Sequence, residues 1–407
     1  MAAGAGTGPF AGLKVLDLSR VLAGPSCGQL LADFGADVIK VEDVGGDENR
    51  KWAPVIGGES ANFMSVNRGK CGMTLNLKSP AGQEILAGLV RASDVVIDSF
   101  LPAVAKRLGV DDASLRKHRR DLVHVTISGY GHEGPLAARP GYDLMLQAFS
   151  GMMAMTGEPG GGPIRAGASF IDMATGMLAF SGVATALYAR LAGRATGTAQ
   201  GQHIQVSLLE TAIALLGYHV PAYTVAGKVP ARDGSGVWHI VPYQAFATTD
   251  GHILAGATND AAWQRLCKAI GADDLAANPA YATSTQRIEQ REPVIAGLSK
   301  IFATKPTDHW VAVLDAANVP CSPVNDIAHA LAHPQVAAMK MVIDVAGRDA
   351  PGGGPLRLVG VPLNLSATPA APGRAPPSLG EHTDTILAET LGYSVDRIAA
   401  LRREGTI

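Results

Sequence analysis

The first segment of the chain has a glycine-containing loop and an acidic residue at a spacing that could serve dinucleotide binding. A short apolar run at 14–18 (KVLDL) precedes the loop at 23–28 (AGPSCG). Glu42 follows roughly twenty residues after the first glycine, where an acidic side chain would hold a ribose hydroxyl. The loop lacks the G-x-G-x-x-G pattern, however, and Pro25 removes a backbone N–H where a pyrophosphate needs donors. We therefore do not predict an NAD enzyme.

A second residue that could carry chemistry is Asp172, in the segment 171–176 (IDMATG). It precedes a run of small and apolar residues with helical spacing. Taken alone, an aspartate just before a helix is most often an N-cap whose carboxylate accepts backbone N–H bonds. The local pattern by itself therefore predicts a structural cap.

Metal and redox sites are not expected. Four cysteines, Cys27, Cys71, Cys267 and Cys321, are scattered without C-x-x-C spacing, which argues against both a zinc site and a disulfide framework. Reduced thiols in a cytoplasm are the simplest interpretation. A formal net charge of −2 provides no broad positive field, so nucleic acid is not an expected partner.

No segment predicts export or a membrane partner. Residues 1–12 lack the basic and apolar regions of a signal peptide. The stretch 173–189 has no charge, but it contains two glycines and falls short of a membrane span. We expect a helix buried on most sides and a cytoplasmic protein.

The elements that must position these residues alternate between strand and helix. Short apolar runs typical of buried strands lie at 14–18, 37–42, 74–77, 94–98 and 122–128. Helical patterns lie between them, at 29–34, 81–92 and 104–108. This alternation predicts an α/β fold with a Rossmann-like, doubly wound parallel sheet. Farther on, two long helices are expected on either side of a glycine-rich loop at 157–167.

Three regions are expected along the chain. Residues 1–226 form a large α/β domain that holds Asp172, and the Gly/Pro-containing segment 227–236 marks its boundary. Residues 227–330, with a strand at 252–257 and two helices, form a smaller α+β domain. Residues 331–407 return to complete the large domain, through a Pro/Gly-rich stretch at 350–377 and a helix at 383–391.

Several blocks together resemble the class III CoA transferases, also called the CaiB/BaiF family, which includes formyl-CoA transferase and carnitine CoA-transferase. The opening GLKVLDLSRVLAGPSCGQLLADFGADVIKVE is similar to the start of that family almost element for element. Further similar blocks, in family order, are FMSVNRGKCGMTLNLKSPAG, DVVIDSFLPAVAKRLG, HVTISGYGHEGP, GYDLMLQAFSGMMAMTG, SFIDMATGMLAFSGVATALYAR, VPCSPVNDIAHALAHPQV and APPSLGEHT. The resemblance spans nearly the whole chain.

The resemblance implies that Asp172 is the catalytic nucleophile, which the positive end of a helix would keep ionised. It also implies that acyl-CoA is the substrate and that no metal or redox cofactor is required. The positions that match CoA-binding residues of the family are Val21, Ala23, Leu75, Lys78, Phe100, Arg107 and Tyr142. Lys78 and Arg107 have a physical motive, because CoA phosphates favour fixed cations.

Two alternatives stay open at this point. The same superfamily includes α-methylacyl-CoA racemases, whose acid/base histidine falls here on Tyr142 and whose glutamate falls on Ala247. Tyrosine, with a pKa near 10, is a poor base at pH 7, which disfavours racemisation. A CoA-binding protein without catalytic activity is the alternative from another class. Leu22 and Ser99 replace a glutamine and an asparagine of formyl-CoA transferase, which puts the formyl/oxalate substrate pair in doubt.

The subgroup that the chain most resembles moves CoA from succinyl-CoA to another dicarboxylate. The free carboxylate of such a substrate needs a cation or several donors when it is buried. Arg165 and His239 are candidates, and Gly234 and Gly236 lie where the family often has a mobile glycine loop over the aspartate. By resemblance alone, we also expect an interlocked homodimer.

Overall fold

The computed structural model describes residues 8–407, which divide into two compact units. Unit 1 consists of the chain up to Ser150, of Ala166–Val220 and of Gln335–Ile407. Unit 2 consists of Gly151–Arg165 and Pro221–Pro334. The division lies within a few residues of the expected boundaries at 226 and 330, but it moves the segment 151–165 out of the large domain and into unit 2.

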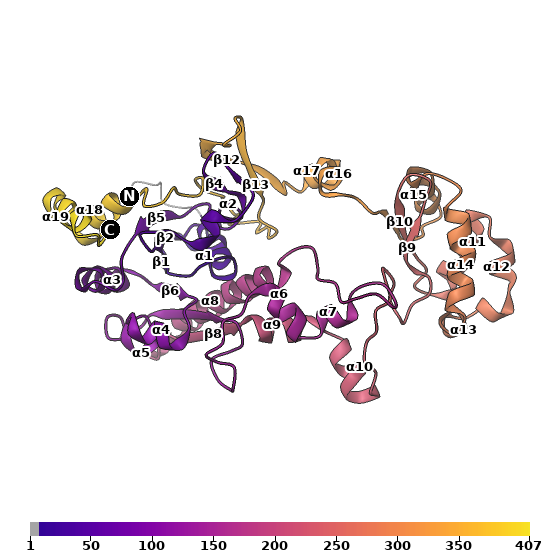
Figure 1. The fold of residues 1–407 in the computed structure, drawn as a ribbon, viewed down its shortest axis with the longest axis horizontal. Helices are drawn as coiled ribbons and strands as arrows, with labels where there is room; N and C mark the ends of the chain where they lie inside the picture. Colours follow the sequence, from indigo (N-terminus) through magenta and orange to yellow (C-terminus); the bar gives the residue numbers. More distant parts are fainter. Residues whose placement is uncertain (1–7) are drawn as a thin grey trace. The chain divides into compact units, whose positions relative to one another are not determined.

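Unit 1 is built on a six-stranded sheet in the order β5-β2-β1-β6-β7-β8 (Figure 1). Every neighbouring pair in it is parallel. The strands are β1 (Lys14–Asp17), β2 (Asp37–Glu42), β5 (Cys71–Thr74), β6 (Val95–Asp98), β7 (Val123–Ser128) and β8 (His203–Ser207). The order runs one way from β1 to β5 and the other way from β6 to β8, which confirms the doubly wound α/β fold.

Two helix layers cover this sheet. The first contains α1 (Ala23–Asp33) and α8 (Phe170–Thr196), which pack against each other, and α8 also contacts β7 and β8. The second includes α3 (Pro80–Ala92), α4 (Pro102–Arg107), α5 (Asp112–Leu115), α18 (Thr383–Leu391) and α19 (Val395–Arg403). A core of buried side chains from both the strands and these helices, such as Leu16, Val96, Ile85 and Leu387, closes the second face.

The local structure differs from the sequence expectation in three places. The glycine-proline loop at 23–28 is the start of α1, because Pro25 sits in the first turn, where a helix does not need its N–H. Strand β5 begins three residues earlier than the predicted run at 74–77. The expected long helix before the 157–167 loop is two short ones, α6 (Asp143–Phe149) and α7 (Met152–Met155), separated by Gly151 with φ +93°.

Helix α8 is long and apolar enough to cross a membrane by length and composition alone. In unit 1 it is a packing helix that contacts α1, α6, α9 and two strands. Contrary to the expectation of burial on most sides, only one face is buried, and Tyr188 and Leu191 are 72% and 62% exposed. Its outer face is therefore apolar and open in the single chain.

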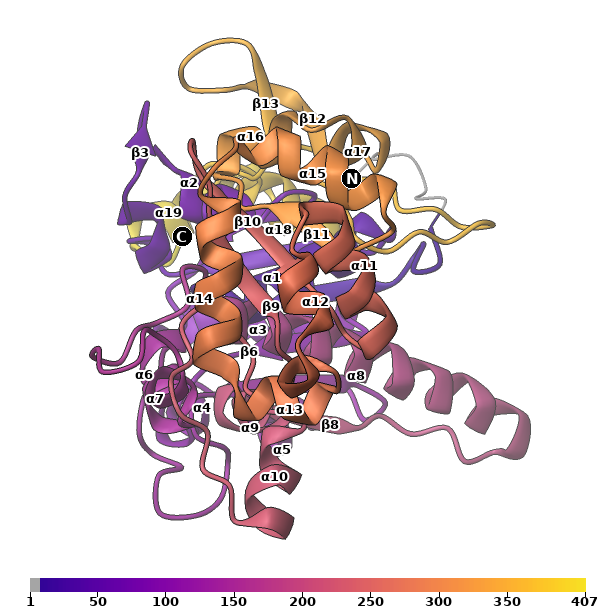
Figure 2. The same ribbon diagram turned by 90° about the vertical axis from the view of Figure 1, so that its right-hand side faces the viewer.

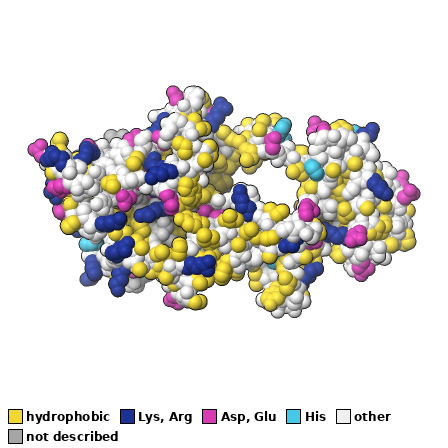
Figure 3. All heavy atoms as spheres, viewed as in Figure 1, with side chains coloured by type: hydrophobic (Ala, Val, Ile, Leu, Met, Phe, Trp, Pro, Cys, Tyr) yellow, Lys and Arg dark blue, Asp and Glu magenta, His cyan; other side chains and the backbone are white. Residues whose placement is uncertain are grey.

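The remaining elements of unit 1 connect or extend these layers. Helix α9 (Leu208–Leu215) follows β8, and the return segment contains the hairpin of β12 (Val342–Asp349) and β13 (Pro355–Val359). Smaller elements are the hairpin β3 (Val55–Ile56) and β4 (Glu59–Ser60), η1 (Glu48–Lys51), α2 (Ala61–Ser65) and α17 (Pro334–Ala338), which begins at the boundary between the units. Basic and acidic side chains are interspersed on the surface drawn in Figure 3, in line with the near-neutral net charge.

Unit 2 has its own antiparallel sheet, β11-β10-β9, formed by Cys321–Pro323, His252–Gly256 and Tyr243–Ala247. Helices α11 (Asp260–Ile270), α14 (Arg291–Phe302) and α15 (Thr307–Ala316) pack around it (Figure 2). They share a core that includes the buried side chains of Trp263 and Phe302. The shorter helices are α12 (Asp273–Ala277), η2 (Pro279–Tyr281), α13 (Ser284–Glu289) and α16 (Ile327–Ala332). Helix α10 (His219–Ala226) leads from unit 1 into unit 2.

Candidate active site

Two adjoining pockets lie where the strand order of the parallel sheet reverses. Their walls come from the segments that follow the carboxyl ends of β1 and β6, with contributions from the ends of β2, β5 and β7. The two pockets share Arg20, Phe100 and Val104. Ligands of open α/β sheets bind at this position, because the loops diverge there and leave a crevice.

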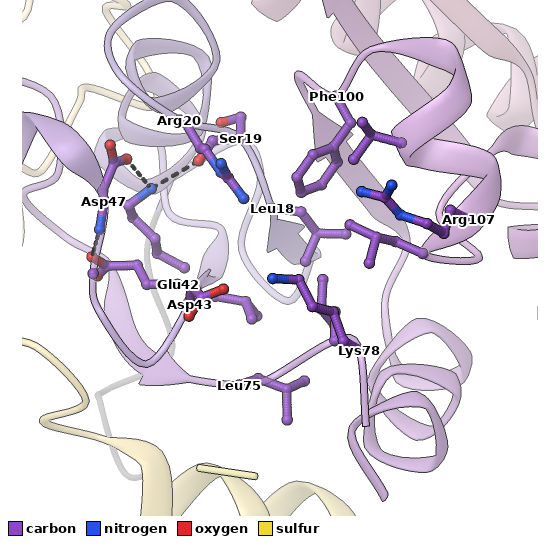
Figure 4. A pocket seen from close by; sticks show the side chains of 16 residues that line it. Leu18, Ser19, Arg20, Glu42, Asp43, Asp47, Leu75, Lys78, Phe100 and Arg107 are labelled. Atoms are coloured by element: carbon purple, nitrogen blue, oxygen red, sulfur yellow. Dashed lines mark hydrogen bonds and ion pairs between the residues drawn. The ribbon is translucent and has the colours of Figure 1, made fainter. Parts of the chain in front are cut away.

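The first pocket, here called the cation-lined pocket, contains Arg20, Lys78 and Arg107 around the ring of Phe100 (Figure 4). Arg20 lies over that ring, with its guanidinium carbon 5.0 Å from the ring centre. Leu18 and Leu75 are buried in its wall, and the acidic Glu42, Asp43 and Asp47 lie on its other side. Three cations beside an aromatic face can bind a phosphorylated aromatic ligand.

The second pocket, here called the Asp172 pocket, contains Val21, Leu22, Ala23, Tyr142 and Asp172. All seven predicted CoA-binding residues therefore line one of the two pockets, and the predicted nucleophile lies in the same connected space. The structure brings these residues together from the segments after β1, β5 and β6, and from α4, α6 and α8.

Asp172 does not cap its helix, contrary to the prediction from local pattern. It is the third residue of α8, and Ser169 occupies the N-cap without a side-chain hydrogen bond. The cap comes from Asp143 on α6, whose Oδ2 accepts hydrogen bonds from the N–H of Ile171 at 2.8 Å and of Asp172 at 3.1 Å. The Nε2 of Gln147 donates to the other oxygen of Asp143 at 2.5 Å. Asp143 thus caps the start of α8, and the carboxylate of Asp172 is not used as a cap and can react with a ligand in the pocket.

The ionisation of Asp172 also differs from the expectation. Its side chain is 7% exposed, and within residues 8–407 no donor hydrogen bonds to its carboxylate. Burial, followed by the negative charge of Asp143, raises the pKa of Asp172 to about 7. The N–H groups of Ile171 and Asp172 at the start of the helix are bonded to Asp143 and not to the carboxylate of Asp172. At neutral pH the free carboxyl is therefore shared between its acid and its nucleophilic form.

Gly176 brings Asp172 close to the loop that follows β1. A Cβ atom at this glycine would lie 2.6 Å from the backbone oxygen of Ala23 and 1.8 Å from Oγ of Ser26. Contacts this short do not occur between real atoms, so α8 can approach the start of α1 only with glycine at this position. The small residue in the 171–176 segment therefore places the carboxylate against the wall that Ala23 provides.

The loop after β1 is held in an unusual backbone conformation at Val21, where φ is +67°. A β-branched residue rarely adopts this left-handed region, which costs of the order of 1–2 kcal/mol. Asp47 accepts hydrogen bonds from the N–H of Val21 at 3.2 and 3.3 Å, and Asn49 donates to its carbonyl oxygen at 2.6 Å. Both peptide groups of Val21 are thus clamped from the segment after β2.

Lys40 fixes the position of Asp47, the residue that accepts from the N–H of Val21. Its Nζ, which is fully buried, donates to Asp47 at 3.1 Å and to the carbonyl of Ser19 at 2.9 Å. Burial alone would lower the pKa of Lys40, but the charges of Asp47 and Asp17 outweigh it and hold the pKa above its ordinary value. A charged lysine therefore anchors the strained loop at the junction of the two pockets.

The racemase positions carry no acid/base pair in this structure. Tyr142 is the N-cap residue of α6, and its hydroxyl donates to Glu48 at 3.4 Å. Burial and the neighbouring Glu48 raise the pKa of Tyr142 above its ordinary value, which makes it a still poorer base at pH 7. Ala247 ends β9 and has no ionisable group.

The residues predicted for substrate binding, Arg165, Gly234, Gly236 and His239, occur in unit 2. There the two predicted loops meet, because the N–H of Gly234 donates to the carbonyl of Gly157 at 2.9 Å. Gly234 has φ +63°, and a Cβ there would lie 2.8 Å from Oε2 of Glu158. Arg232 also donates to the carbonyl of Ala154 at 3.0 Å. The ring of His239 packs edge-on against Trp238.

Sequence reasoning missed Asp143, Gln147, Lys40 and Asp47. Asp143 directly follows Tyr142, and the family blocks do not indicate that its carboxylate caps α8. A carboxylate and an amide four residues apart on a short helix, as in Asp143 and Gln147, were the available signal. Nothing in the sequence indicates that Lys40 and Asp47 meet under the loop of Val21, because that contact depends on how β1 and β2 pair.

The comparisons with known proteins agree with the geometry. A sequence model of the family described as CoA-transferase family III matches residues 10–383. A succinyl-CoA:glutarate CoA-transferase from Homo sapiens is 34% identical over 401 residues, which cover 98% of this chain and 90% of that protein. An acetyl-CoA:oxalate CoA-transferase from Acetobacter aceti is 38% identical over 355 residues, which cover 87% and 90%. A CaiB/BaiF family protein from Brucella suis has a similar structure, with a TM-score of 0.84, 34% identity and coverage of 94% and 99%.

Proposed function

We propose that this chain, a CoA transferase that belongs to CoA-transferase family III, moves CoA from succinyl-CoA to a free dicarboxylate through a covalent intermediate on Asp172. One observation carries the proposal. Within residues 8–407, neither a cation nor a hydrogen-bond donor pairs with the carboxylate of the buried Asp172, which lies at the wall of a pocket that continues into the cation-lined pocket. A carboxylate with no partner of its own is free to react.

The proposed reaction needs four transfers and no net proton. The Asp172 carboxylate attacks the thioester carbonyl, which gives a mixed anhydride and releases CoA thiolate. The thiolate attacks the aspartyl carbonyl of the anhydride, which releases the donor acid and leaves an aspartyl-CoA thioester. The acceptor carboxylate attacks this thioester and again releases thiolate, and the thiolate then takes the acceptor acyl group from the second anhydride. Asp172 returns as a carboxylate, and neither metal nor redox chemistry is required.

The cation-lined pocket would bind the nucleotide part of CoA, and the Asp172 pocket would hold the reacting thioester. Arg20, Lys78 and Arg107 carry the charge that CoA phosphates require, and Phe100 offers a face to the adenine. Val21, Leu22 and Ala23 supply an apolar wall beside Asp172, where a thioester excluded from water would resist hydrolysis.

The acceptor class is proposed from chemistry and from the relatives together. The two relatives named above act on glutarate and on oxalate by name, and both acids are dicarboxylates. The second carboxylate of such an acid needs a cation, and Arg165 and His239 are the proposed groups. Succinyl-CoA offered with a panel of mono- and dicarboxylic acids tests this, with new acyl-CoA species followed by mass spectrometry. Equal transfer to matched monocarboxylic acids would overturn the acceptor class and leave the reaction type intact.

A trapping experiment tests the intermediate. Hydroxylamine or borohydride should modify the protein only after exposure to acyl-CoA, and the adduct should map to the peptide that contains Asp172. The adduct should be absent in Asp172→Asn, whose amide cannot form the anhydride. Label on a cysteine, or no label during active turnover, would contradict the mechanism.

The same preparation separates the transferase from a racemase. In deuterated water, a 2-methylacyl-CoA should take up no deuterium at its α-carbon, because neither Tyr142 nor Ala247 supplies a base. Deuterium uptake at a catalytic rate would replace the proposed reaction with racemisation.

We further propose that the chain forms a homodimer, with a second copy covering the outer face of α8. The support is that Leu178, Tyr188 and Leu191 on this helix are large, apolar and exposed in the single chain. Light scattering after gel filtration should give twice the mass of one chain, and Leu191→Glu should lower it. A monomeric wild type at micromolar concentration would exclude the dimer.

A further inference from the structure

A cluster of histidines and aspartates lies at the β8 edge of the large sheet, apart from the two pockets. Strand pairing sets His124 of β7 directly opposite His203 of β8. Their rings stack with centres 4.6 Å apart and planes within 8°. Asp112 of α5 completes the group, and one ligand atom from each of the three residues lies within 4.8 Å of the other two.

The hydrogen bonds around the cluster indicate which nitrogen of each histidine ring carries a hydrogen. Oδ2 of Asp98 accepts from the hydroxyl of Thr126 at 2.9 Å and from Nε2 of His124 at 2.8 Å. Because that hydroxyl gives its only hydrogen to Asp98, it accepts from Nε2 of His203, which lies 2.9 Å away. Both imidazoles therefore carry hydrogen on Nε2, which leaves Nδ1 of each as the ligand atom. A carboxylate that orients a histidine in this way is the usual support of a metal ligand.

The spacing of the nearest ligand atoms fits a first-row metal ion. Nδ1 of His124 lies 3.3 Å from Oδ1 of Asp112. Tetrahedral ligands at about 2.0 Å from zinc are about 3.3 Å from each other. His203 is exposed, so its ring can move the short distance that ligation requires, whereas His124 is buried and fixed.

A fourth side chain adds an independent observation. The ring centre of His132 lies 6.2 Å from that of His203. Its Nε2 is buried and has no hydrogen-bond partner within residues 8–407. A buried ring nitrogen without a partner is rare, and an ion at the neighbouring cluster would supply one.

We propose that Asp112, His124 and His203 form a binding site for a divalent transition-metal ion of the Zn²⁺ class, and that the ring of His132 turns toward the ion as a fourth ligand. Imidazole nitrogens with one carboxylate suit Zn²⁺, Co²⁺ and Ni²⁺ rather than the oxygen-binding Mg²⁺ and Ca²⁺. When the ion binds, it displaces the proton that lies between Nδ1 of His124 and Oδ1 of Asp112. This proton is released to solvent. The ion would tie α5 to the edge of the sheet and takes no part in the transfer reaction. Asp98, which orients His124, also accepts the N–H of Phe100 at 3.0 Å and so connects the site to the cation-lined pocket.

Chelator-treated full-length protein, titrated with Co²⁺ and Zn²⁺, tests the proposal. Visible absorption should report tetrahedral Co²⁺, and calorimetry should give one Zn²⁺ per chain and a higher melting temperature with Zn²⁺ bound. His203→Ala replaces an exposed ligand and should fold, yet we expect at least a tenfold loss of affinity. Thr126→Val removes the hydroxyl that accepts from His203 and donates to Asp98, which orients His124, and the variant should lose about tenfold or more in affinity.

His329→Ala is the matched control, because His329 also contacts an aspartate, Asp326, at 2.7 Å, but within residues 8–407 the two belong to no cluster of three potential metal ligands. Its Zn²⁺ affinity should equal that of the wild type. Two results would overturn the site. One is a wild type that binds neither ion at micromolar concentration, which would mean that His124 simply keeps its hydrogen between two aspartates. The other is binding that His203→Ala leaves unchanged.

Discussion

Asp17 and Asp172 are both buried carboxylates of unit 1, and their surroundings are opposite. Asp17 ends β1 and lies 2.8 Å from Nζ of the fully buried Lys70. Burial would raise the pKa of Asp17, but Lys70 and Lys40 outweigh it and hold that pKa below its ordinary value. Among the residues that the structure describes, no cation pairs with Asp172, and burial together with the charge of Asp143 raises its pKa to about 7. Burial alone therefore does not identify a reactive carboxylate, whereas burial without a partner does.

Asp17, the carboxylate that is paired with a lysine, has a structural role. Lys70 also donates to the carbonyl of Pro25 at 2.7 Å and to Asn67 at 2.8 Å, so one ammonium group joins β1, the start of α1 and the segment before β5. A buried ion pair of this kind is costly to break, because the remaining charge has no solvent to stabilise it. The contrast with Asp172 can be tested by removing each charge in turn.

The largest expected effect is the loss of transfer in Asp172→Asn, by at least about 10⁴-fold in kcat, because no anhydride can form. CoA affinity should change little, since the cation-lined pocket is untouched. Steady-state exchange from succinyl-CoA and calorimetric CoA binding measure the two effects. Asp172→Glu is the matched control, which keeps the charge but displaces it by one methylene and should lose most of the rate. Exchange at the wild-type rate in Asp172→Asn would remove Asp172 from the mechanism.

The partnered carboxylate should show the reverse pattern, with a loss of stability. Lys70→Met leaves Asp17 buried without its cation, which should cost about 3–5 kcal/mol and lower the melting temperature sharply. Asp17→Asn together with Lys70→Met should recover much of this loss, because neither member of the pair is then left buried with an uncompensated charge. Calorimetric melting of both variants measures the effect. An unchanged melting temperature in Lys70→Met would show that the pair contributes nothing.

The next comparison isolates the effect of Asp143 on Asp172. In the wild type, kcat/KM for acyl-CoA should rise with pH through about 7, because only ionised Asp172 attacks. Asp143→Asn removes a like charge, which lowers the pKa of Asp172 and should move this rise to lower pH by about one unit. The full pH profile separates this shift from a uniform loss caused by a poorer helix cap. A profile that stays in place would show that burial alone sets the pKa.

The raised pKa of Asp172 should also make the stability of the protein depend on pH. Between the ordinary pKa of an aspartate, 3.8, and about 7, the folded protein keeps the Asp172 proton that the unfolded chain has lost. The contribution of Asp172 to the free energy of unfolding is therefore fully present at low pH. It is lost as the pH rises through that window, and the total loss is at most about 4 kcal/mol. Asp172→Asn should melt at a higher temperature than the wild type at pH 8, and the difference should shrink at pH 5. A difference that is constant with pH would contradict the raised pKa.

The sequence by itself determined the parallel α/β unit, and its resemblance to the family indicated residues that line the two pockets. Short apolar runs separated by helical spacing imply crossovers, and crossovers place every strand end at one edge of the sheet. The expectation that Val21, Lys78 and Phe100 share one site came from the resemblance to the family, and the parallel sheet explains why residues so distant in sequence meet there. The identity of Asp172 as the candidate nucleophile came from the resemblance of its segment and not from its spacing.

Only the tertiary structure decided how Asp172 is charged and what holds it. Asp143 reaches the start of α8 across 29 positions of sequence, and its charge together with burial reverses the expectation of a permanently ionised carboxylate. The clamp on Val21 and the pairing of His124 with His203 arise in the same way, because each depends on which strands or loops lie side by side. Burial and long-range charge are properties of the packed chain, and the local pattern of residues does not contain them.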